Sequence, residues 1–272
     1  MGLSSTEISY LLETAVVAAR LAGQRALEEL RFVHTTQKDA DELVTQADPI
    51  CQKIIVDHIK ENYPDHGFLG EEGHGGKMFK LAPRGEQGIW WVIDPIDGTN
   101  NFANGLLCFS VSIAALQDGQ PIVGVVFEPA TDSMFTAAAG MEAQMNGSRI
   151  QVSRQDLNRF ACFGIESYLT AEFAKPYQAI MVKTRFRCLG STALHLAYVA
   201  KGAMVGSVTI RSRLWDIAAG ALLVERAGGF VSSPDGKSLF PADPSSYQGD
   251  YLPIVAGSLK KKEEILEFFQ MK

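Results

Sequence analysis

The sequence lacks the features that mark several large classes of protein. Basic residues are not in excess: 25 lysines and arginines stand against 31 aspartates and glutamates, a net charge of −6. Nucleic-acid binders need a basic surface to contact phosphates, so this charge argues against that class. The N-terminus has no basic segment followed by an apolar run, and Glu13, Arg20 and Arg25 interrupt its first apolar pattern. We therefore expect neither secretion nor membrane insertion, but a cytoplasmic location.

Cysteine is scarce, and its spacing suggests no pairing. The four cysteines, at positions 51, 108, 162 and 188, include no Cys-x-x-Cys pair, so neither a zinc site nor a redox pair is indicated. The five histidines also show no paired spacing, and we expect ordinary roles for them. There is no internal repeat and no low-complexity tract. With 46% hydrophobic residues, the 272-residue chain can bury a large core in one large domain or two moderate ones.

What the sequence does contain is a pair of carboxylates at the end of an apolar run. Residues 89–93 are apolar without alternation, which is typical of a strand buried on both faces. Asp94 follows where we expect this strand to leave the core, and Pro95 is expected to end the strand pairing. Asp97 comes three residues after Asp94, and Gly98 then gives the backbone freedom for a turn.

Two explanations fit this carboxylate pair. Two charges on one turn repel each other by about 4 kcal/mol at 4 Å and an effective dielectric near 20, so a divalent cation would stabilise them. The alternative is an Asx turn without chemistry, because Asp and Gly are ordinary turn residues. Further acidic residues favour the cation: Glu71 and Glu72 follow a short apolar run, and Asp216 opens a helical run.

Hydrophobic spacing predicts the elements around these motifs. An amphipathic helix is expected over residues 8–30, and a second helix from Asp48, as its N-cap, to about Tyr63. Residues 73–88 are rich in Gly, Lys and Pro and are expected to form a mobile loop. Further on, an antiparallel meander is expected over 109–116, 122–127 and 134–137. Two helices, each closed by a glycine, are expected over 191–201 and 216–227. Two short strands are expected over 204–210 and 252–256.

The order of these elements predicts two domains. Helices precede strands up to about Met145, whereas helices and short strands alternate after Asn146. We expect an N-terminal α+β domain over residues 1–145, with the Glu71 and Asp94–Thr99 motifs. A C-terminal α/β domain over residues 146–272 would carry the Asp216 motif.

In their order and separations, these motifs resemble those of the inositol monophosphatase family of magnesium-dependent, lithium-sensitive sugar-phosphate phosphatases. The resemblance rests on three segments, Gly70-Glu71-Glu72, Asp94-Pro95-Ile96-Asp97-Gly98-Thr99 and Trp215-Asp216-Ile217-Ala218-Ala219-Gly220. It covers nearly the whole chain, with residues 43–48 ahead of the segments and a Gly-Gly pair behind them. It implies a mixed α+β and α/β fold, a layered α-β-α-β-α sandwich of the inositol monophosphatase and fructose-1,6-bisphosphatase type, and a homodimer.

The resemblance also implies a role for each acidic residue. Glu71, Asp94 and the backbone carbonyl of Ile96 would bind a first Mg²⁺ ion. Asp94 would bridge to a second Mg²⁺ ion held by Asp97 and Asp216, and Glu71 would help to bind a weaker third ion. Such cations would reverse the local field of an acidic protein, so that it attracts an anionic substrate.

The catalytic set implied by the family is Glu71, Thr99 and Asp48. Thr99 would orient the attacking water, and Asp48 would accept the Thr99 proton through a hydrogen bond. The backbone amides of Gly98 and Thr99 would bind the phosphate, as amides exposed at a turn do. Local explanations exist as well, because an acidic residue such as Asp48 or Asp216 suits the start of a helix.

The resemblance places the sugar ring against the C-terminal domain, at residues 190–193 and the segment before Trp215, and one of these contacts departs from the family's pattern. Members that favour inositol tend to carry a glutamate seven residues before the aspartate of the third motif, where this chain has Thr209. Arg213 would instead suit a second phosphate or a carboxylate, because its planar fork matches both. The full set of expected substrate-binding residues is Asp97, Gly98, Thr99, Gly190, Ser191, Thr192, Thr209, Arg213 and Asp216.

The implied activity is magnesium-dependent hydrolysis of a small phosphate monoester, inositol 1-phosphate or a related sugar phosphate. Alternatives on the same fold are fructose-1,6-bisphosphatase, 3'-phosphoadenosine 5'-phosphate phosphatase and histidinol phosphatase. A haloacid-dehalogenase-type phosphatase is disfavoured because two residues, not one, separate Asp94 from Asp97. A degenerate, non-catalytic regulatory protein is disfavoured because every metal carboxylate is present. The expected partners are a small phosphorylated substrate and a second copy of the chain, without nucleic acid or membrane.

Overall fold

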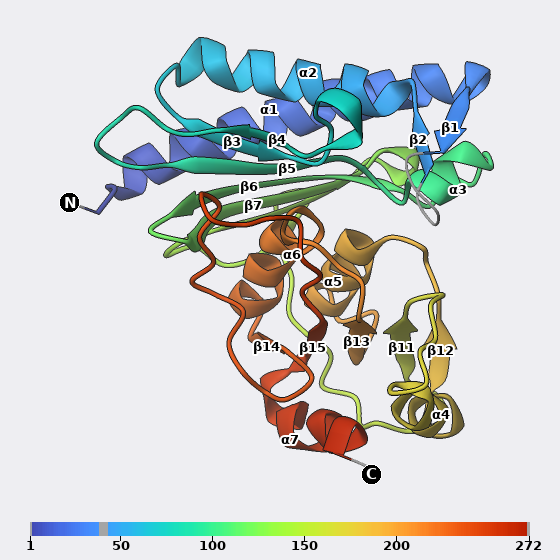
Figure 1. The fold of residues 1–272 in the computed structure, drawn as a ribbon. Coiled ribbons are helices and arrows are strands. Elements are labelled where there is room, and N and C mark those ends of the chain that lie inside the picture. Colours follow the sequence, from blue (N-terminus) through green and yellow to red (C-terminus); the bar gives the residue numbers. More distant parts are fainter. Residues whose placement is uncertain (1, 38–42, 271–272) are drawn as a thin grey trace.

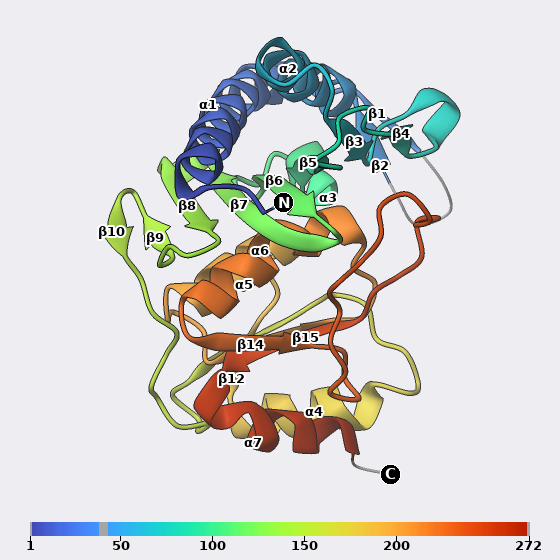
Figure 2. The ribbon, with the colours of Figure 1, turned by 90° about the vertical axis from the view of Figure 1, so that its left-hand side faces the viewer.

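Layers of helix and sheet alternate in the computed structural model, which describes residues 2–37 and 43–270 (Figure 1). Helices α1 and α2 cover the outer face of the larger sheet, α5 and α6 lie between the two sheets, and α4 and α7 cover the far face of the smaller sheet (Figure 2). This confirms the α-β-α-β-α sandwich. The helices are α1 (Ser5–Glu29), α2 (Ala47–Asn62), α3 (Thr99–Ala103), α4 (Ala174–Lys183), α5 (Thr192–Ala200), α6 (Leu214–Arg226) and α7 (Lys262–Leu266).

The larger sheet carries the central motif. Its strands lie in the order β10-β9-β8-β7-β6-β5-β3-β4, and β6, β7 and β8 form the expected antiparallel meander. Only the β3–β5 pair is parallel among the described strands of this sheet, and it sets Gly70 opposite Ile93. The strands are β3 (Gly67–Gly70), β4 (Phe79–Leu81), β5 (Trp90–Asp97), β6 (Ser110–Gln117), β7 (Gln120–Glu128), β8 (Ser133–Ala138), β9 (Gln144–Met145) and β10 (Ser148–Arg149).

Strand β5 is buried on both faces, as its sequence predicts. Trp91 and Ile93 pack toward α1 and α2, whereas Trp90 and Val92 pack toward α5 and α6. The expectation that Pro95 ends the pairing is wrong, because β5 continues to Asp97, which pairs with Ser110 of β6. The register shifts between Asp94 and Asp97. Such a bulge accommodates a proline, which has no N–H to donate to the ladder.

The smaller sheet mixes parallel and antiparallel pairs in the order β12-β11-β13-β15-β14. Strand β13 lies within the apolar run 204–210, as expected, whereas β15 overlaps the run 252–256 and continues two residues beyond it. Strand β11 runs parallel to β13 with Ile165 opposite Val208, so the residues that follow these strands meet at one edge. The strands are β11 (Cys162–Ile165), β12 (Arg185–Arg187), β13 (Gly206–Thr209), β14 (Gly229–Ser232) and β15 (Ile254–Ser258).

Several boundaries differ from the sequence-based expectations. Helix α2 begins at Ala47, so Asp48 lies in its first turn and is not the N-cap. Helix α6 begins at Leu214, two residues before Asp216. Residues 73–88 are not a loop throughout, because β4 pairs with β3 within them. The side chains of Phe79 and Leu81 explain this strand, since both pack against the core below α1 and α2.

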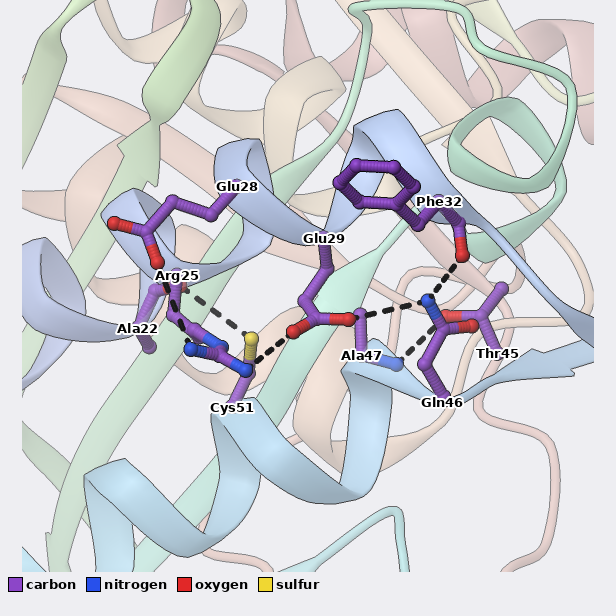
Figure 3. Close-up of polar contacts among 9 residues, drawn as sticks. All are labelled: Ala22, Arg25, Glu28, Glu29, Phe32, Thr45, Gln46, Ala47 and Cys51. Atoms are coloured by element: carbon purple, nitrogen blue, oxygen red, sulfur yellow. Dashed lines mark hydrogen bonds and ion pairs between the residues drawn. The ribbon is translucent and has the colours of Figure 1, made fainter.

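The start of α2 is anchored to the end of α1 (Figure 3). Gln46 Nε2 donates hydrogen bonds to Glu29 Oε2 at 3.2 Å and to the carbonyl oxygen of Phe32 at 2.9 Å. Cys51 Sγ lies 3.4 Å from the carbonyl oxygen of Ala22, and Arg25 pairs with Glu29. Together with the short antiparallel pair β1 (Thr35–Gln37) and β2 (Leu43–Thr45), these contacts fix the start of α2, which packs against β5.

The apolar core extends across the two predicted domains. Helix α6 packs against β6 and β7, although it follows the expected boundary after residue 145. One cluster of buried side chains accordingly joins Val92 of β5 to Trp215 and Ile217 of α6. The division into domains 1–145 and 146–272 stays a prediction. Within the described residues, no helix combines the length and the apolar character needed to cross a membrane.

Candidate active site

Three aspartates from two distant parts of the chain meet where the larger sheet contacts α6. Asp94 and Asp97 flank the bulge in β5, and Asp216 lies in the first turn of α6. Their carboxylate oxygens lie within 4.8 Å of one another. At this spacing each pair of charges repels by roughly 3 kcal/mol at an effective dielectric near 20. A bound cation would offset this repulsion.

Burial raises the pKa of all three carboxyl groups. For Asp94 burial is the largest cause, and the charges of Glu71, Asp97 and Asp216 raise its pKa further. The pKa of Asp216 is raised by burial and then by Asp97 and Glu71. For Asp97 burial outweighs the hydrogen bonds that lower its pKa. Burial and mutual repulsion therefore disfavour the charged form of these groups when no cation is bound. A hard cation would stabilise the charged form, because carboxylate oxygens are its preferred ligands.

Each aspartate is also held by backbone amides. Asp94 Oδ1 accepts a hydrogen bond from Ile96 N at 3.0 Å, so the Asx turn considered above exists together with the carboxylate cluster. Asp216 Oδ2 accepts one from Arg213 N at 2.7 Å, which supports the start of α6. The local explanations of these residues and a metal site are thus compatible, because each carboxylate has two oxygens.

Asp97 lies at the start of α5. Its carboxylate accepts hydrogen bonds from Ala193 N at 2.7 Å and Thr192 N at 3.2 Å. The Ser191 hydroxyl, which caps α5, also donates to Asp97, and Ser110 Oγ lies 3.4 Å away. Ser191 and Thr192, expected to contact substrate, therefore contact Asp97 here, and through it they link α5 to the acidic cluster.

Glu71 approaches the cluster from β3. Glu71 N donates to the carbonyl oxygen of Ile93 at 3.2 Å, which continues the parallel β3–β5 pairing to the residue before Asp94. Among the described residues, the carboxylates that meet within 4.8 Å do not include Glu71. Its negative charge nevertheless raises the pKa values of Asp94 and Asp216. Glu71 is thus close enough to Asp94 and Asp216 for its charge to act on them, although it is not one of the three carboxylates that meet.

Gln52 is a positioning residue that the sequence analysis missed. Its Oε1 accepts a hydrogen bond from Glu72 N at 2.9 Å, and its Nε2 donates to the carbonyl oxygen of Glu72. A Cβ on Gly70 would lie only 2.4 Å from Gln52 Oε1, so any other residue at position 70 would displace the Gln52 amide from this position. The available clue was helical spacing, because Gln52 lies one turn after Asp48 on α2.

Asp48 and Thr99 form the expected hydrogen bond. Thr99 Oγ1 lies 3.1 Å from Asp48 Oδ1 and 2.9 Å from the carbonyl oxygen of Ile96. The other carboxylate oxygen of Asp48 accepts from Thr45 N at 2.8 Å. Burial raises the pKa of Asp48 to about 6, although these hydrogen bonds oppose the shift. At neutral pH Asp48 is therefore ionised and can accept a proton.

The backbone conformation at Gly98 is one that only glycine adopts readily. Its φ is 101°, and a Cβ there would lie 3.1 Å from the carbonyl oxygens of Cys108 and Gly190. Asn101, a second residue that sequence reasoning missed, donates hydrogen bonds at 2.6 Å to the carbonyl oxygens of Cys108 and Leu189. The turn after β5 is therefore clamped against both neighbouring segments.

Five of the nine expected substrate-binding residues line two cavities. Arg213 lines one of about 680 Å³ together with Glu71, Lys77 and Lys80. The other, of about 450 Å³, is lined by residues that include Gly190, Ser191, Thr192 and Thr209. Thr209 and Arg213 therefore line different cavities. The two cavities are neighbours, because the Arg213 guanidinium lies 5.4 Å from the centre of the Tyr251 ring, and Tyr251 lines the second cavity.

The donor set fits a magnesium centre. Carboxylate oxygens of three aspartates lie together, Glu71 is adjacent, and the carbonyl oxygen of Ile96 lies within hydrogen-bond distance of Thr99. Hard oxygen donors of this kind are the ligands that Mg²⁺ prefers. Cysteine and histidine are not part of the cluster, which disfavours zinc.

A sequence model of the inositol monophosphatase family matches residues 7–269. The chain belongs to the inositol monophosphatase family. Among similar proteins of this family, the Nus factor SuhB of Escherichia coli is 39% identical over 231 residues, which are 82% of this chain and 84% of the relative. The family membership confirms the resemblance that the three acidic motifs indicate.

Solved structures agree with this inositol monophosphatase fold. The extragenic suppressor protein suhB of Bartonella henselae superposes with a TM-score of 0.85 and 29% identity, covering 96% of this chain and 98% of that one. The IMPase of Thermotoga maritima gives a TM-score of 0.81 at 32% identity, covering 95% and 96%. At the level of the family, this supports a metal-binding, magnesium-dependent phosphatase.

Proposed function

We propose that this protein hydrolyses a small phosphate monoester, inositol 1-phosphate or a related sugar phosphate, with magnesium as cofactor. The observation that carries the proposal is the buried cluster of Asp94, Asp97 and Asp216, with oxygens within 4.8 Å. Phosphate monoesters hydrolyse so slowly that enzymes supply up to ~10²¹-fold acceleration. One positioned acid or base gives about 10² to 10⁴, so metal ions must supply much of the rest.

The carboxylates would hold two Mg²⁺ ions and a weaker third. Glu71, Asp94 and the carbonyl oxygen of Ile96 are the proposed ligands of the first, and Asp94, Asp97 and Asp216 those of the second. When bound, such ions lower the pKa of water and stabilise charge on the leaving oxygen. Lithium inhibition is expected at the second of these positions.

Thr99 and Asp48 are the proposed catalytic pair. The Thr99 hydroxyl is fixed by its hydrogen bond to Asp48 and is free to accept one from the attacking water. Asp48 then accepts the Thr99 proton, and its ionised state at neutral pH suits this role. The backbone amides of Gly98 and Thr99, which follow the clamped turn, are proposed to bind the phosphate.

The other predictions about substrate and partners remain part of this proposal. Fructose 1,6-bisphosphate, 3'-phosphoadenosine 5'-phosphate and histidinol phosphate are the alternative substrates, and Arg213 would suit a second anionic group. A homodimer, a cytoplasmic location and the absence of nucleic-acid and membrane partners stay predictions. Relatives that carry the name Nus factor give a reason to test a non-catalytic regulatory role as the second candidate.

Phosphate release tests the proposal directly. The purified protein is assayed with Mg²⁺ and with EDTA on inositol 1-phosphate, fructose 1,6-bisphosphate, histidinol phosphate and 3'-phosphoadenosine 5'-phosphate. We expect magnesium-dependent release from at least one of them. Absence of release from all four, in a protein that binds Mg²⁺ and is folded, would favour the regulatory role.

A further inference from the structure

A segment of the C-terminal half of the chain reaches the larger sheet. The chain between β14 and β15 rises from the smaller sheet, approaches the larger one and returns (Figures 1 and 2). We call residues 243–252 of this segment the strap. The Asp243 carboxylate accepts hydrogen bonds from Ser245 N at 2.9 Å and from Ser245 Oγ at 2.7 Å, and its carbonyl oxygen accepts one from Tyr247 N. These contacts give the strap a defined shape.

One side of the strap is attached to the hairpin of β3 and β4. Lys80 Nζ donates hydrogen bonds to the carbonyl oxygens of Ser245 at 3.1 Å and of Tyr247 at 2.5 Å. Lys80 belongs to β4, which pairs with β3, and β3 ends at the residue before Glu71. The strap is therefore attached beside the strand that positions Glu71.

The other side of the strap is attached to the first turn of α6. The Tyr247 hydroxyl accepts a hydrogen bond from Leu214 N at 3.1 Å and donates one to the carbonyl oxygen of Asp250 at 2.6 Å. Leu214 is the first residue of α6, where backbone amides have no partner within the helix. The Tyr247 ring also packs edge-on against Trp215, with ring centres 5.9 Å apart. Asp216 follows directly.

The cavity of about 680 Å³ lies between these two attachments. It is lined by Glu71 and Lys80 on the hairpin side, by Arg213 and Trp215 at the start of α6, and by strap residues that include Gln248. Because this space is a cavity, close packing of side chains does not fix the distance across it. The strap spans that distance through its hydrogen bonds at both ends.

Magnesium binding depends on accurate placement of the ligands. Mg²⁺ demands a near-ideal octahedron of oxygens at about 2.0–2.1 Å. Asp94 and Asp97 share strand β5, and Glu71 N is hydrogen-bonded to the carbonyl oxygen of Ile93 in the same strand. Asp216 comes from α6, so its position depends on how the start of this helix is held.

We propose that the strap fixes Asp216 relative to Glu71. Lys80 and Tyr247 are then positioning residues, which raise the affinity for Mg²⁺ without contacting the ion. Residues that orient metal ligands in this way typically contribute 10- to 100-fold to metal affinity. The inference rests on the proposed magnesium site and deepens it, because it assigns part of the affinity to hydrogen bonds outside the ligand set.

Magnesium binding to the metal-free, full-length protein, measured by isothermal titration calorimetry, tests this role independently of turnover. Lys80→Met keeps an aliphatic side chain but removes the donor, and we expect the Kd for Mg²⁺ to rise about tenfold. Tyr247→Phe keeps the ring against Trp215 but removes the hydroxyl, and the same rise is expected. Lys80→Arg keeps a donor and should restore a Kd close to that of the wild type.

A double variant tests whether the two residues act through one connection. Lys80→Met releases one end of the strap and Tyr247→Phe the other, so their effects should not add. We expect the double variant to raise the Kd about as much as either single variant. A rise of about a hundredfold, the product of two independent effects, would overturn the strap as their common cause.

Lys261→Met and Tyr198→Phe are the matched controls. Lys261 is a partly buried lysine paired with Asp156, and the Tyr198 hydroxyl donates to Glu128 at 3.1 Å, both outside the strap. These variants lose the same chemical groups and should leave the Kd unchanged. Thermal unfolding in EDTA, followed by circular dichroism, shows that each variant is folded before its Kd is compared.

Failure of the inference and failure of the proposed function give different results. An unchanged Kd in the folded single variants, or an equal rise in the controls, would overturn the inference. If Lys80→Met does not fold, Tyr247→Phe and its control decide the question. A wild type that binds Mg²⁺ but releases phosphate from no substrate would overturn the function, and the Kd values would still decide the role of the strap. A wild type that does not bind Mg²⁺ would overturn both.

Discussion

Replacement of Asp94 by asparagine should separate the electrostatic cost of the acidic cluster from its use in binding magnesium. In the wild type, Ile96 N donates a hydrogen bond to Asp94 Oδ1 at 3.0 Å. The asparagine side chain keeps an oxygen that can accept this hydrogen bond, so the bulge in β5 should persist. The change removes one charge from three carboxylates within 4.8 Å. Each charged pair costs roughly 3 kcal/mol at this spacing, and partial protonation reduces the cost.

Without metal, we therefore expect Asp94→Asn to be more stable than the wild type by about 1 to 3 kcal/mol. For a chain of this size each kcal/mol shifts Tm by roughly 2–4 °C. With excess Mg²⁺ the order should reverse, because Mg²⁺ at about 1,000 times Kd stabilises the wild type by about 4.1 kcal/mol, more than the expected advantage of the variant. The variant lacks the bridging carboxylate, so it should gain little stability from magnesium and lose turnover.

Thermal unfolding in EDTA and in excess Mg²⁺, followed by circular dichroism, measures both effects. Asp57→Asn is the control, because Asp57 is an exposed residue of α2 paired with Lys53 four positions earlier. Such a surface pair contributes about 0–1 kcal/mol, and its loss should not alter the magnesium response. Equal magnesium-induced shifts in Asp94→Asn and the wild type, or full turnover in the variant, would refute the proposed ligand role of Asp94.

Three further predictions concern the same site. Thr99→Val should lower kcat by about 10²-fold without unfolding, as circular dichroism and phosphate release would show, and wild-type kcat would contradict its role. Because Asp48 accepts a proton only when ionised and its pKa is about 6, kcat/KM should fall as the pH drops through 6, and a pH profile flat to pH 5 would exclude Asp48. Gly98→Ala should cost about 1–2 kcal/mol and most activity, because φ is 101° there, and an unaltered Tm would contradict this strain.

The sequence alone determined the elements with a strong period or a fixed chemistry. The apolar run of residues 89–93 predicted a strand buried on both faces, and the run from residue 8 predicted α1. Family membership was accessible because the acidic motifs occur in a specific order along the chain. The prediction that the strand ends at Pro95 was wrong. Proline has no N–H to donate to the neighbouring strand, but the bulge between Asp94 and Asp97 lets the pairing continue without that hydrogen bond, and local sequence does not reveal the bulge.

The tertiary structure alone decided which residues meet. Asp97 and Asp216 come together only because α6 packs on the larger sheet between β5 and the smaller sheet. Gln52 reaches Glu72, and Glu166 comes beside Thr209, through helix packing and strand pairing that no local motif encodes. Spacing along the chain specifies local conformation, whereas contacts between distant segments depend on how the apolar faces of helices and sheets are buried together.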